Sequence, residues 1–192
     1  AAAFTAGIDA CLKLGADYIV NTDGDNQYAG ADIPTLLAPL LNGDADIVIE
    51  NFRPGTLEKW GLGYAELARD NPGLLMLRMS GFGQTGPMHD QAGFGSVGES
   101  MGGLRYVTGF PDRAPVRMNL SIGDALAAMH GVIGTLMALH HRTVHGGKGQ
   151  VIDVALFEAV FNMMEGTLPE YDMLGEIRER TGTGLSGIVP SN

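Results

Sequence analysis

A pair of carboxylates near the N-terminus has the spacing of a metal-binding motif. Asp23 and Asp25 flank a glycine directly after the apolar run "DYIVNTD" (17–23), which is typical of a short buried strand. Two carboxylates at i and i+2 beyond a strand can chelate one divalent cation, and that cation can neutralise a nucleotide diphosphate. An ordinary turn is the alternative, because Asp, Gly and Asn all favour turns. The triplet alone leaves both interpretations open.

The motif "ENFRPG" (50–55) presents an amide, an aromatic ring and a guanidinium in the consecutive residues Asn51, Phe52 and Arg53. They follow an expected strand over 45–51, and open α/β sheets bind ligands beyond the carboxyl ends of their strands. An aromatic face and a guanidinium suit a nucleotide-bearing thioester. A strand-to-helix turn fixed by the Pro-Gly pair is an equal alternative on these residues alone.

Asp124 stands at the start of a long apolar helix, which we expect over 125–141. An Asp in that place is commonly an N-cap that satisfies free backbone N–H groups, which is worth about 1 kcal/mol. The same place also suits a nucleophile. The positive end of the helix favours a carboxylate by about 0.3–1 kcal/mol and would keep it ionised near neutral pH.

The elements that must position these residues alternate between helices and strands. This order predicts an α/β fold with parallel strand pairing. The expected helices are 2–14, 31–43, 56–70, 95–104 and 125–141, and the expected strands are 17–23, 45–51, 74–83 and 149–156.

Composition limits the partners and the compartment. Twelve Lys and Arg against 22 Asp and Glu give a net charge of −10, which disfavours nucleic acid. Cys11 is the single cysteine and cannot form an internal disulfide, so we expect a cytoplasmic protein. Residues 1–17 lack the basic region and long apolar run of a signal peptide. The apolar stretch 125–139 is too short to span a bilayer, so we expect no membrane partner.

From Ala45 onward the chain resembles the class III CoA-transferases, the CaiB/BaiF family that includes formyl-CoA and carnitine CoA-transferases. The resemblance rests on separated motifs that occur in the order of the family. They are "ENFRPG" (50–55), "SGFGQTGP" (80–87), "GESMGGLRYVTG" (98–109), "SIGDALAAMHG" (121–131) and "GGKGQVIDVALFEA" (146–159). The resemblance implies a Rossmann-like open parallel sheet flanked by helices, as an incomplete large domain of a CoA-transferase.

The resemblance also implies roles for individual residues. Asp124 falls where the family has its nucleophile, Asn51, Phe52 and Arg53 would belong to the CoA pocket, and Lys59 would lie near the CoA phosphates. The implied reaction moves CoA between an acyl-CoA and a small carboxylic acid through an aspartyl anhydride and thioester. It requires coenzyme A as a co-substrate and no metal or redox cofactor, and the family implies a homodimer.

Related racemases pair the aspartate with a histidine, and Phe94 occupies the position of that histidine here. Racemisation requires two acid/base groups on opposite faces of a carbon, so this substitution favours transfer.

Residues 1–49 resemble a different family, the family 2 glycosyltransferases of the polyprenyl-phosphate sugar type. That resemblance implies that Asp23 and Asp25 bind a metal and a sugar nucleotide. We therefore expect a glycosyltransferase-like helix-strand-helix segment over 1–45 and a CoA-transferase-like large-domain fragment over 46–192. The alternatives to CoA transfer are a glycosyltransferase that uses a nucleotide sugar with a divalent metal, and an inactive chimeric remnant.

Overall fold

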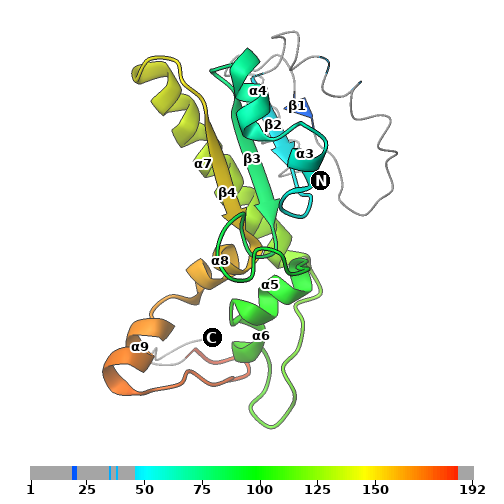
Figure 1. Cartoon of the computed structure of the whole chain (residues 1–192). Coiled ribbons are helices and arrows are strands. Elements are labelled where there is room, and N and C mark those ends of the chain that lie inside the picture. The colour runs from blue at the N-terminus through cyan, green and yellow to red at the C-terminus, as the bar shows by residue number, and fades with distance from the viewer. Residues whose placement is uncertain (1–18, 21–34, 36–37, 39–45, 186–192) are drawn as a thin grey trace.

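The computed structural model describes residues 19–20, 35, 38 and 46–185 (Figure 1). The predicted helix 2–14 and the pair Asp23 and Asp25 lie outside these residues. Of the predicted helix 31–43, only residues 35 and 38 are described, and both are helical. In chain order the elements are β1 (Ile19–Val20), β2 (Ile47–Glu50), α3 (Thr56–Lys59), α4 (Tyr64–Asp70), β3 (Leu75–Ser80), α5 (Gly95–Met101), α6 (Leu104–Val107), α7 (Ile122–Val144), β4 (Gln150–Ala155), α8 (Leu156–Phe161), η2 (Asn162–Met164) and α9 (Thr167–Leu174).

The described strands form one parallel sheet in the order β1-β2-β3-β4. β3 pairs with both β2 and β4, and its first four residues, 75–78, are buried. A strand covered on both faces requires an apolar run without alternation, which explains the sequence "LLMLRMS". The predicted α/β fold with a parallel sheet is therefore confirmed. The predicted strands 45–51, 74–83 and 149–156 agree with β2, β3 and β4 to within three residues at each end, and the two described residues of the predicted strand 17–23 form β1.

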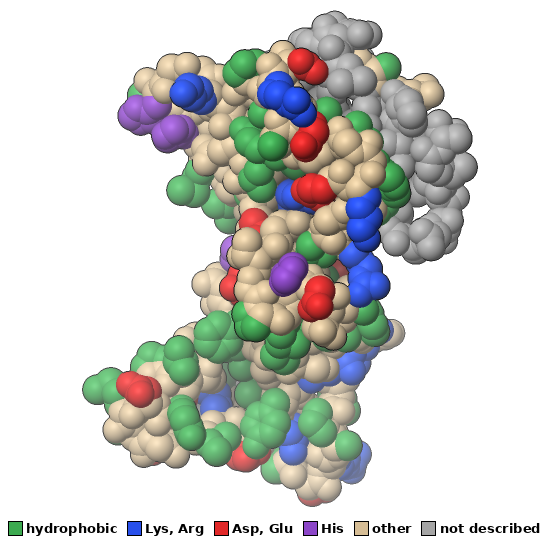
Figure 2. Space-filling model, in the orientation of Figure 1, with side chains coloured by type: hydrophobic (Ala, Val, Ile, Leu, Met, Phe, Trp, Pro, Cys, Tyr) green, Lys and Arg blue, Asp and Glu red, His purple; other side chains and the backbone are tan. Residues whose placement is uncertain are grey.

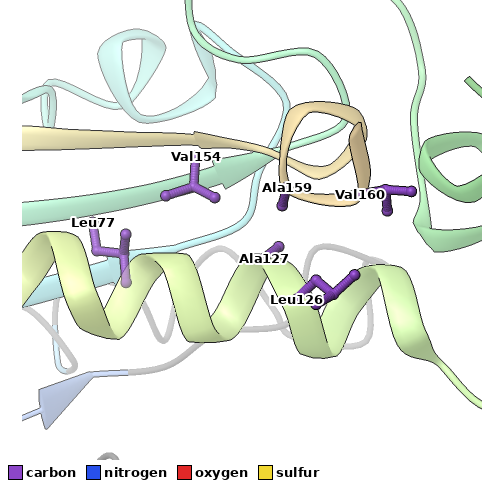
Figure 3. Packing of buried hydrophobic residues seen from close by; sticks show 6 residues of the cluster. All are labelled: Leu77, Leu126, Ala127, Val154, Ala159 and Val160. Carbon is purple, nitrogen blue, oxygen red and sulfur yellow. The ribbon is translucent and has the colours of Figure 1, made fainter. Parts of the chain in front are cut away.

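Helices cover both faces of this sheet. Successive side chains of β3 point to opposite faces, so neighbouring residues of the strand contact different helices. Met76 packs on one side with Leu57 of α3 and Leu67 of α4. Leu77 packs on the other side against α7 and α8. That second cluster consists of Leu77, Leu126, Ala127, Val154, Ala159 and Val160 (Figure 3).

The predicted helix over 56–70 is wrong as a single element. The chain forms α3 and α4 instead, and between them Gly61 adopts a φ of 73°. That left-handed conformation cannot continue an α-helix and is the usual way to end one. The predicted helix 95–104 is divided in the same way, because α5 ends at Met101 and α6 begins at Leu104 after a glycine pair.

The long helix α7 extends beyond its predicted bounds of 125–141 at both ends. Ser121 is its N-cap residue, so Asp124 lies inside the first turn and is not the cap. Among the described residues, α7 is the one helix long and apolar enough to suit a membrane span by length and composition. In the structure one side of α7 packs against β3, β4, α5 and α8, whereas Met129, Ile133 and Met137 each expose more than half of their surface.

Candidate functional site

A cavity of about 500 Å³ opens beyond the carboxyl ends of β2 and β3. Its walls are the turn 51–54 after β2, residues 79–81 at the end of β3, the loop 91–94, Asp124 in the first turn of α7, and Leu156. The structure thus brings Asn51, Phe52 and Arg53 to the same cavity as Asp124, although some 70 residues of chain separate them. Parallel strands with helical crossovers place their carboxyl ends at one edge, and this edge is where such sheets bind ligands.

The turn after β2 is held by a carboxylate that is buried at the end of the strand. Glu50 is 2% exposed, and its Oε2 accepts a hydrogen bond from the backbone N–H of Phe52 at 2.7 Å. Its Oε1 accepts from Nε of Arg78 at 2.5 Å, across from the neighbouring strand β3. The side chain of Glu50 therefore fixes the direction in which the chain leaves the sheet and enters the cavity wall.

Arg78 joins the buried carboxylate of Glu50 to the more exposed carboxylate of Glu58 on α3. Its Nη1 and Nη2 donate to Oε1 and Oε2 of Glu58 at 2.6 and 3.2 Å. The hydrogen bond from Arg78 lowers the pKa of Glu58. Burial alone would lower the pKa of Arg78, but hydrogen bonds to Glu58 and Glu50 raise it, so the arginine stays charged. Because bidentate pairs of this kind have fixed geometry, the network ties β2, β3 and α3 into one unit beneath the cavity.

The side chains of the turn make further contacts at the rim. The ring of Phe52 packs edge-on against Trp60, with 5.3 Å between the ring centroids. Nη2 of Arg53 donates to the carbonyl oxygen of Asp90 at 2.8 Å, which links the turn to the loop on the opposite wall. Lys59 is the last residue of α3, is exposed, and is not part of the cavity lining.

The loop that follows β3 folds back against the strand through two glycines. A Cβ built on Gly81 would overlap the backbone of Gly93, because it would lie 2.5 Å from the Cα of Gly93 and 3.1 Å from its nitrogen. Both positions therefore require glycine for this close approach. Asp153 of β4 supports the same loop, because its Oδ2 accepts the backbone N–H of Gln84 at 2.9 Å.

Asp124 lies against the start of α5 with no side chain in between. A Cβ built on Gly95 would lie 3.0 Å from Cγ of Asp124 and closer to one carboxylate oxygen. Burial and the nearby charge of Glu99 raise the pKa of Asp124, and the charge of Arg117 opposes this. The expectation from the helix end alone, which favours the ionised form, is therefore incomplete, because burial acts in the opposite direction.

Two further observations bear on the chemistry of the cavity. Phe94 lines it and is 62% exposed, so an aromatic ring forms this part of the wall. Among the described residues, no group of three or more His, Cys, Asp or Glu side chains is placed to hold a metal ion.

Sequence reasoning missed the Glu50–Arg78–Glu58 network and the buried Glu99. A charged residue inside the apolar run of β3 was the available signal for Arg78, since a buried charge requires a partner. The partners lie 28 and 20 residues away along the chain, which no local pattern reveals.

Comparison with known proteins places this chain in a family. The model of CoA-transferase family III matches residues 36–192. The succinyl-CoA–D-citramalate CoA-transferase of Chloroflexus aurantiacus is 59% identical over 147 residues, which are 77% of this chain and 36% of that protein. The acetyl-CoA:oxalate CoA-transferase of Acetobacter aceti is 36% identical over 147 residues, which are 76% of this chain and 38% of that protein.

A solved structure agrees with these matches. The crystal structure of a CaiB/BaiF family protein from Brucella suis has a TM-score of 0.74 and 37% identity, and the match covers 80% of this chain and 40% of that one. The chain spans little more than a third of the length of the curated relatives that it matches. From the family model, these relatives and the shared fold, we conclude that the chain belongs to CoA-transferase family III.

Proposed function

We propose that this chain carries the central part of a CoA-transferase active site, which moves CoA between an acyl-CoA and a small carboxylic acid. One observation carries the proposal. Asp124 and the corner formed by Asn51, Phe52 and Arg53 line the same cavity at the carboxyl edge of the sheet. A carboxylate nucleophile and a binding surface for a nucleotide thioester are the two features that the reaction requires.

The proposed reaction begins with attack by a carboxylate oxygen of Asp124 on the thioester carbonyl of an acyl-CoA. A C–O bond forms, the C–S bond breaks, and CoA leaves as a thiolate, which leaves a mixed anhydride on the protein. The thiolate then attacks the aspartyl carbonyl, releases the first carboxylic acid and gives an aspartyl-CoA thioester. The incoming carboxylate attacks the carbonyl of this aspartyl-CoA thioester, which releases the CoA thiolate and forms a second mixed anhydride. The thiolate then attacks the acyl carbonyl of that anhydride, which yields the new acyl-CoA and restores Asp124.

Two properties of the cavity support this sequence of steps. The raised pKa of Asp124 makes its carboxylate more basic and therefore a stronger nucleophile once ionised. Gly81 and Gly93 line the wall without side chains, so backbone groups can approach a carbonyl closely there. Both bonds that form on the aspartate are activated acyl bonds, so we propose a reaction without a metal or redox cofactor.

The co-substrate is coenzyme A, and we propose that the turn 51–54 binds it. The ring of Phe52 offers a stacking face, and the guanidinium of Arg53 offers a charge for phosphate oxygens. Lys59 lies outside the cavity on α3, and we propose that it meets the phosphates farther along the CoA molecule.

We propose an acyl-CoA and a small carboxylic acid as the substrate pair. The names of the relatives support this, because one protein is described as acting on succinyl-CoA and D-citramalate and another on acetyl-CoA and oxalate. We propose transfer and not racemisation, because the cavity wall has Phe94 in place of a second acid/base group.

Exchange of acyl groups tests the proposed function directly. The chain is incubated with succinyl-CoA and, in turn, citramalate, malate, mesaconate or oxalate, and the products are separated by liquid chromatography. We expect a new acyl-CoA with at least one acceptor, and none with Asp124→Asn. Failure to form any new acyl-CoA with these acceptors, or equal formation by the variant, would refute the proposal.

We propose that the functional assembly is a homodimer in the cytoplasm. Figure 2 shows hydrophobic side chains gathered over α9 and the segments beside it. They include Leu168, Tyr171, Met173, Leu174 and Ile177, of which each exposes more than half of its surface. Patches of this kind are covered in assemblies more often than they are left in water. Light scattering should give twice the mass of one chain, and a stable monomer would contradict the proposal.

The proposed cytoplasmic location rests on cysteine content, because the single cysteine of the chain supports a reducing compartment.

We propose, as a separate hypothesis, that the N-terminal segment over 1–45 derives from a family 2 glycosyltransferase; its support is the sequence "GIDACLKLGADYIVNTDGDNQYAGADIPTLLAPLL" (7–41), which contains Asp23 and Asp25. The matched family range begins at residue 36, ten residues before the second unit that we expect over 46–192. The comparisons give the glycosyltransferase alternative no support. Calorimetry with a nucleotide sugar and Mn²⁺ decides it, since the hypothesis requires binding that Asp23→Asn abolishes.

A further inference from the structure

The carboxylate of Glu99 is the most deeply buried charged group near the cavity that the proposed reaction does not use. Glu99 lies on α5 and is 1% exposed. Its Oε2 accepts from Nε of Arg105 at 3.3 Å and lies 3.7 Å from Nε of Arg117. Its Oε1 has no hydrogen-bond partner among the described residues. A buried oxygen of this kind is rare in folded proteins and calls for an explanation.

Two glycines place Glu99 close to Asp124. Gly95 precedes Glu99 by four residues, so both lie on the same face of α5, and Gly95 touches the Asp124 carboxylate. On the other helix, a Cβ at Gly123 would lie 3.4 Å from Cγ of Glu99 and 3.1 Å from the carbonyl oxygen of Gly95. The first turn of α7 therefore packs directly on α5, with the Asp124 carboxylate against Gly95 and the Glu99 side chain against Gly123.

We propose that Glu99 is a positioning residue for the nucleophile: a buried negative charge, balanced by Arg105 and Arg117, that acts on the Asp124 carboxylate across the contact between α5 and α7. This inference rests on the role proposed above for Asp124. A negative neighbour makes a carboxylate more basic, and a more basic carboxylate attacks a carbonyl more readily.

The arginines set the limit of this effect. Arg105 also donates from Nη2 to Oγ of Ser96 at 2.5 Å, so its guanidinium is fixed on α5 beside Glu99. Arg117, in the segment before α7, lowers the pKa of Asp124 while Glu99 raises it. Arg53 is the other charged residue on the cavity wall, and its guanidinium is bound to the carbonyl of Asp90. Two charged side chains therefore act on the Asp124 carboxylate: Glu99, which raises its pKa, and Arg117, which lowers it. Each charge can be removed by a separate substitution.

A titration without substrate tests the inference. The chain is labelled with ¹³C at the side-chain carboxyl of Asp, and the resonance of Asp124 is identified by its loss in Asp124→Asn. We expect the midpoint of its titration to move to lower pH in Glu99→Gln and to higher pH in Arg117→Gln. Arg113→Gln is the matched control, because Arg113 lies in the same segment and its side chain pairs with the exposed residues Asp112 and Phe110. The midpoint of Asp124 in this variant should equal that of the wild type.

Shifts of opposite sign would separate an electrostatic role from a structural one, because loss of packing does not change sign with the charge removed. An unchanged midpoint in folded Glu99→Gln or in Arg117→Gln overturns the inference. If Glu99→Gln does not fold, Arg105→Gln decides, because Arg105 pairs with Glu99 and is not itself among the charges that shift Asp124. Loss of this counter-charge should move the midpoint to higher pH, and an unchanged midpoint overturns the inference.

The pH profile of aspartyl adduct formation from acyl-CoA then tests the link to catalysis. Its acidic limb should move with the titration midpoint in each variant, and a limb that stays fixed while the midpoint moves also overturns the inference. A wild-type chain that forms no adduct would refute the proposed function, whereas the titration would still decide whether Glu99 acts on Asp124.

Discussion

Gly95→Ala should disable the cavity while leaving the fold in place. The added Cβ would lie 3.0 Å from Cγ of Asp124 and would overlap one carboxylate oxygen. Carbon atoms in ordinary contact lie about 3.5–4.0 Å apart, so the carboxylate must move by about 0.5–1 Å. There is little room toward α5, because α5 and α7 are already in close contact at Gly123, so the carboxylate must leave its present place and move toward the cavity.

The size of the effect follows from that displacement. A misplacement of about 1 Å can cost about 10²-fold in rate, which corresponds to about 2.7 kcal/mol of barrier. Overpacking by one methyl group costs about 1–3 kcal/mol of stability. We therefore expect the rate of acyl transfer to Asp124 to fall about a hundredfold in a chain that still unfolds cooperatively.

Single-turnover measurement of the Asp124 adduct, by rapid quench and mass spectrometry, gives the rate. Gly134→Ala is the matched control, because Gly134 also lies on a helix and its Cβ would meet a side-chain carbon of Ile152 at 2.7 Å, on β4. It should lose similar stability and keep the rate. Full activity in Gly95→Ala, or an equal loss in Gly134→Ala, would refute the steric argument.

The remaining predictions concern the supporting network and the charges of the cavity. Arg78→Met should lower the free energy of unfolding in urea by about 3–5 kcal/mol, because it leaves the buried carboxylate of Glu50 without its cation; a loss below about 1 kcal/mol would contradict this. Arg53→Met should raise KM for acyl-CoA about tenfold with little change in kcat, and an unchanged KM would exclude contact with CoA. Because Asp124 has a raised pKa in the folded chain, its contribution to stability is present below the ordinary carboxyl range and lost as pH rises through the folded pKa. Asp124→Asn should therefore gain Tm relative to the wild type above that range, and a constant difference across pH would contradict the shift.

The parts of the fold that sequence predicted are those that depend on local pattern. The apolar run over 75–80 has the composition of a strand buried on both faces, and it forms β3. The helix boundaries were less accurate, because backbone conformation at single residues decided them. Gly61 ends α3 through its positive φ, and Ser121 occupies the N-cap position of α7, three residues before Asp124, without a capping hydrogen bond from its side chain.

The cavity itself was predictable only through its separate motifs. The turn after β2 and the start of α7 each carried chemistry in sequence, and the parallel sheet brings both to one edge. The groups that support them were harder to predict. Arg78 was visible as a charge inside an apolar strand, but its partners Glu50 and Glu58 lie 28 and 20 residues away, and no local pattern marks Glu99 as buried. Asp124 as a whole is exposed, but its carboxylate touches Gly95 and is partly shielded from water there, so the direction of its pKa shift could not be read from the helix end alone.

Location of the covalent intermediate tests the central claim most directly. The chain is mixed with succinyl-CoA, quenched in acid and digested, and the peptides are mapped by mass spectrometry. The account predicts a succinyl or CoA adduct on Asp124, absent in Asp124→Asn and lost on treatment with hydroxylamine. An Asp124 peptide that stays unmodified while acyl exchange proceeds, or an adduct on another residue, would contradict it.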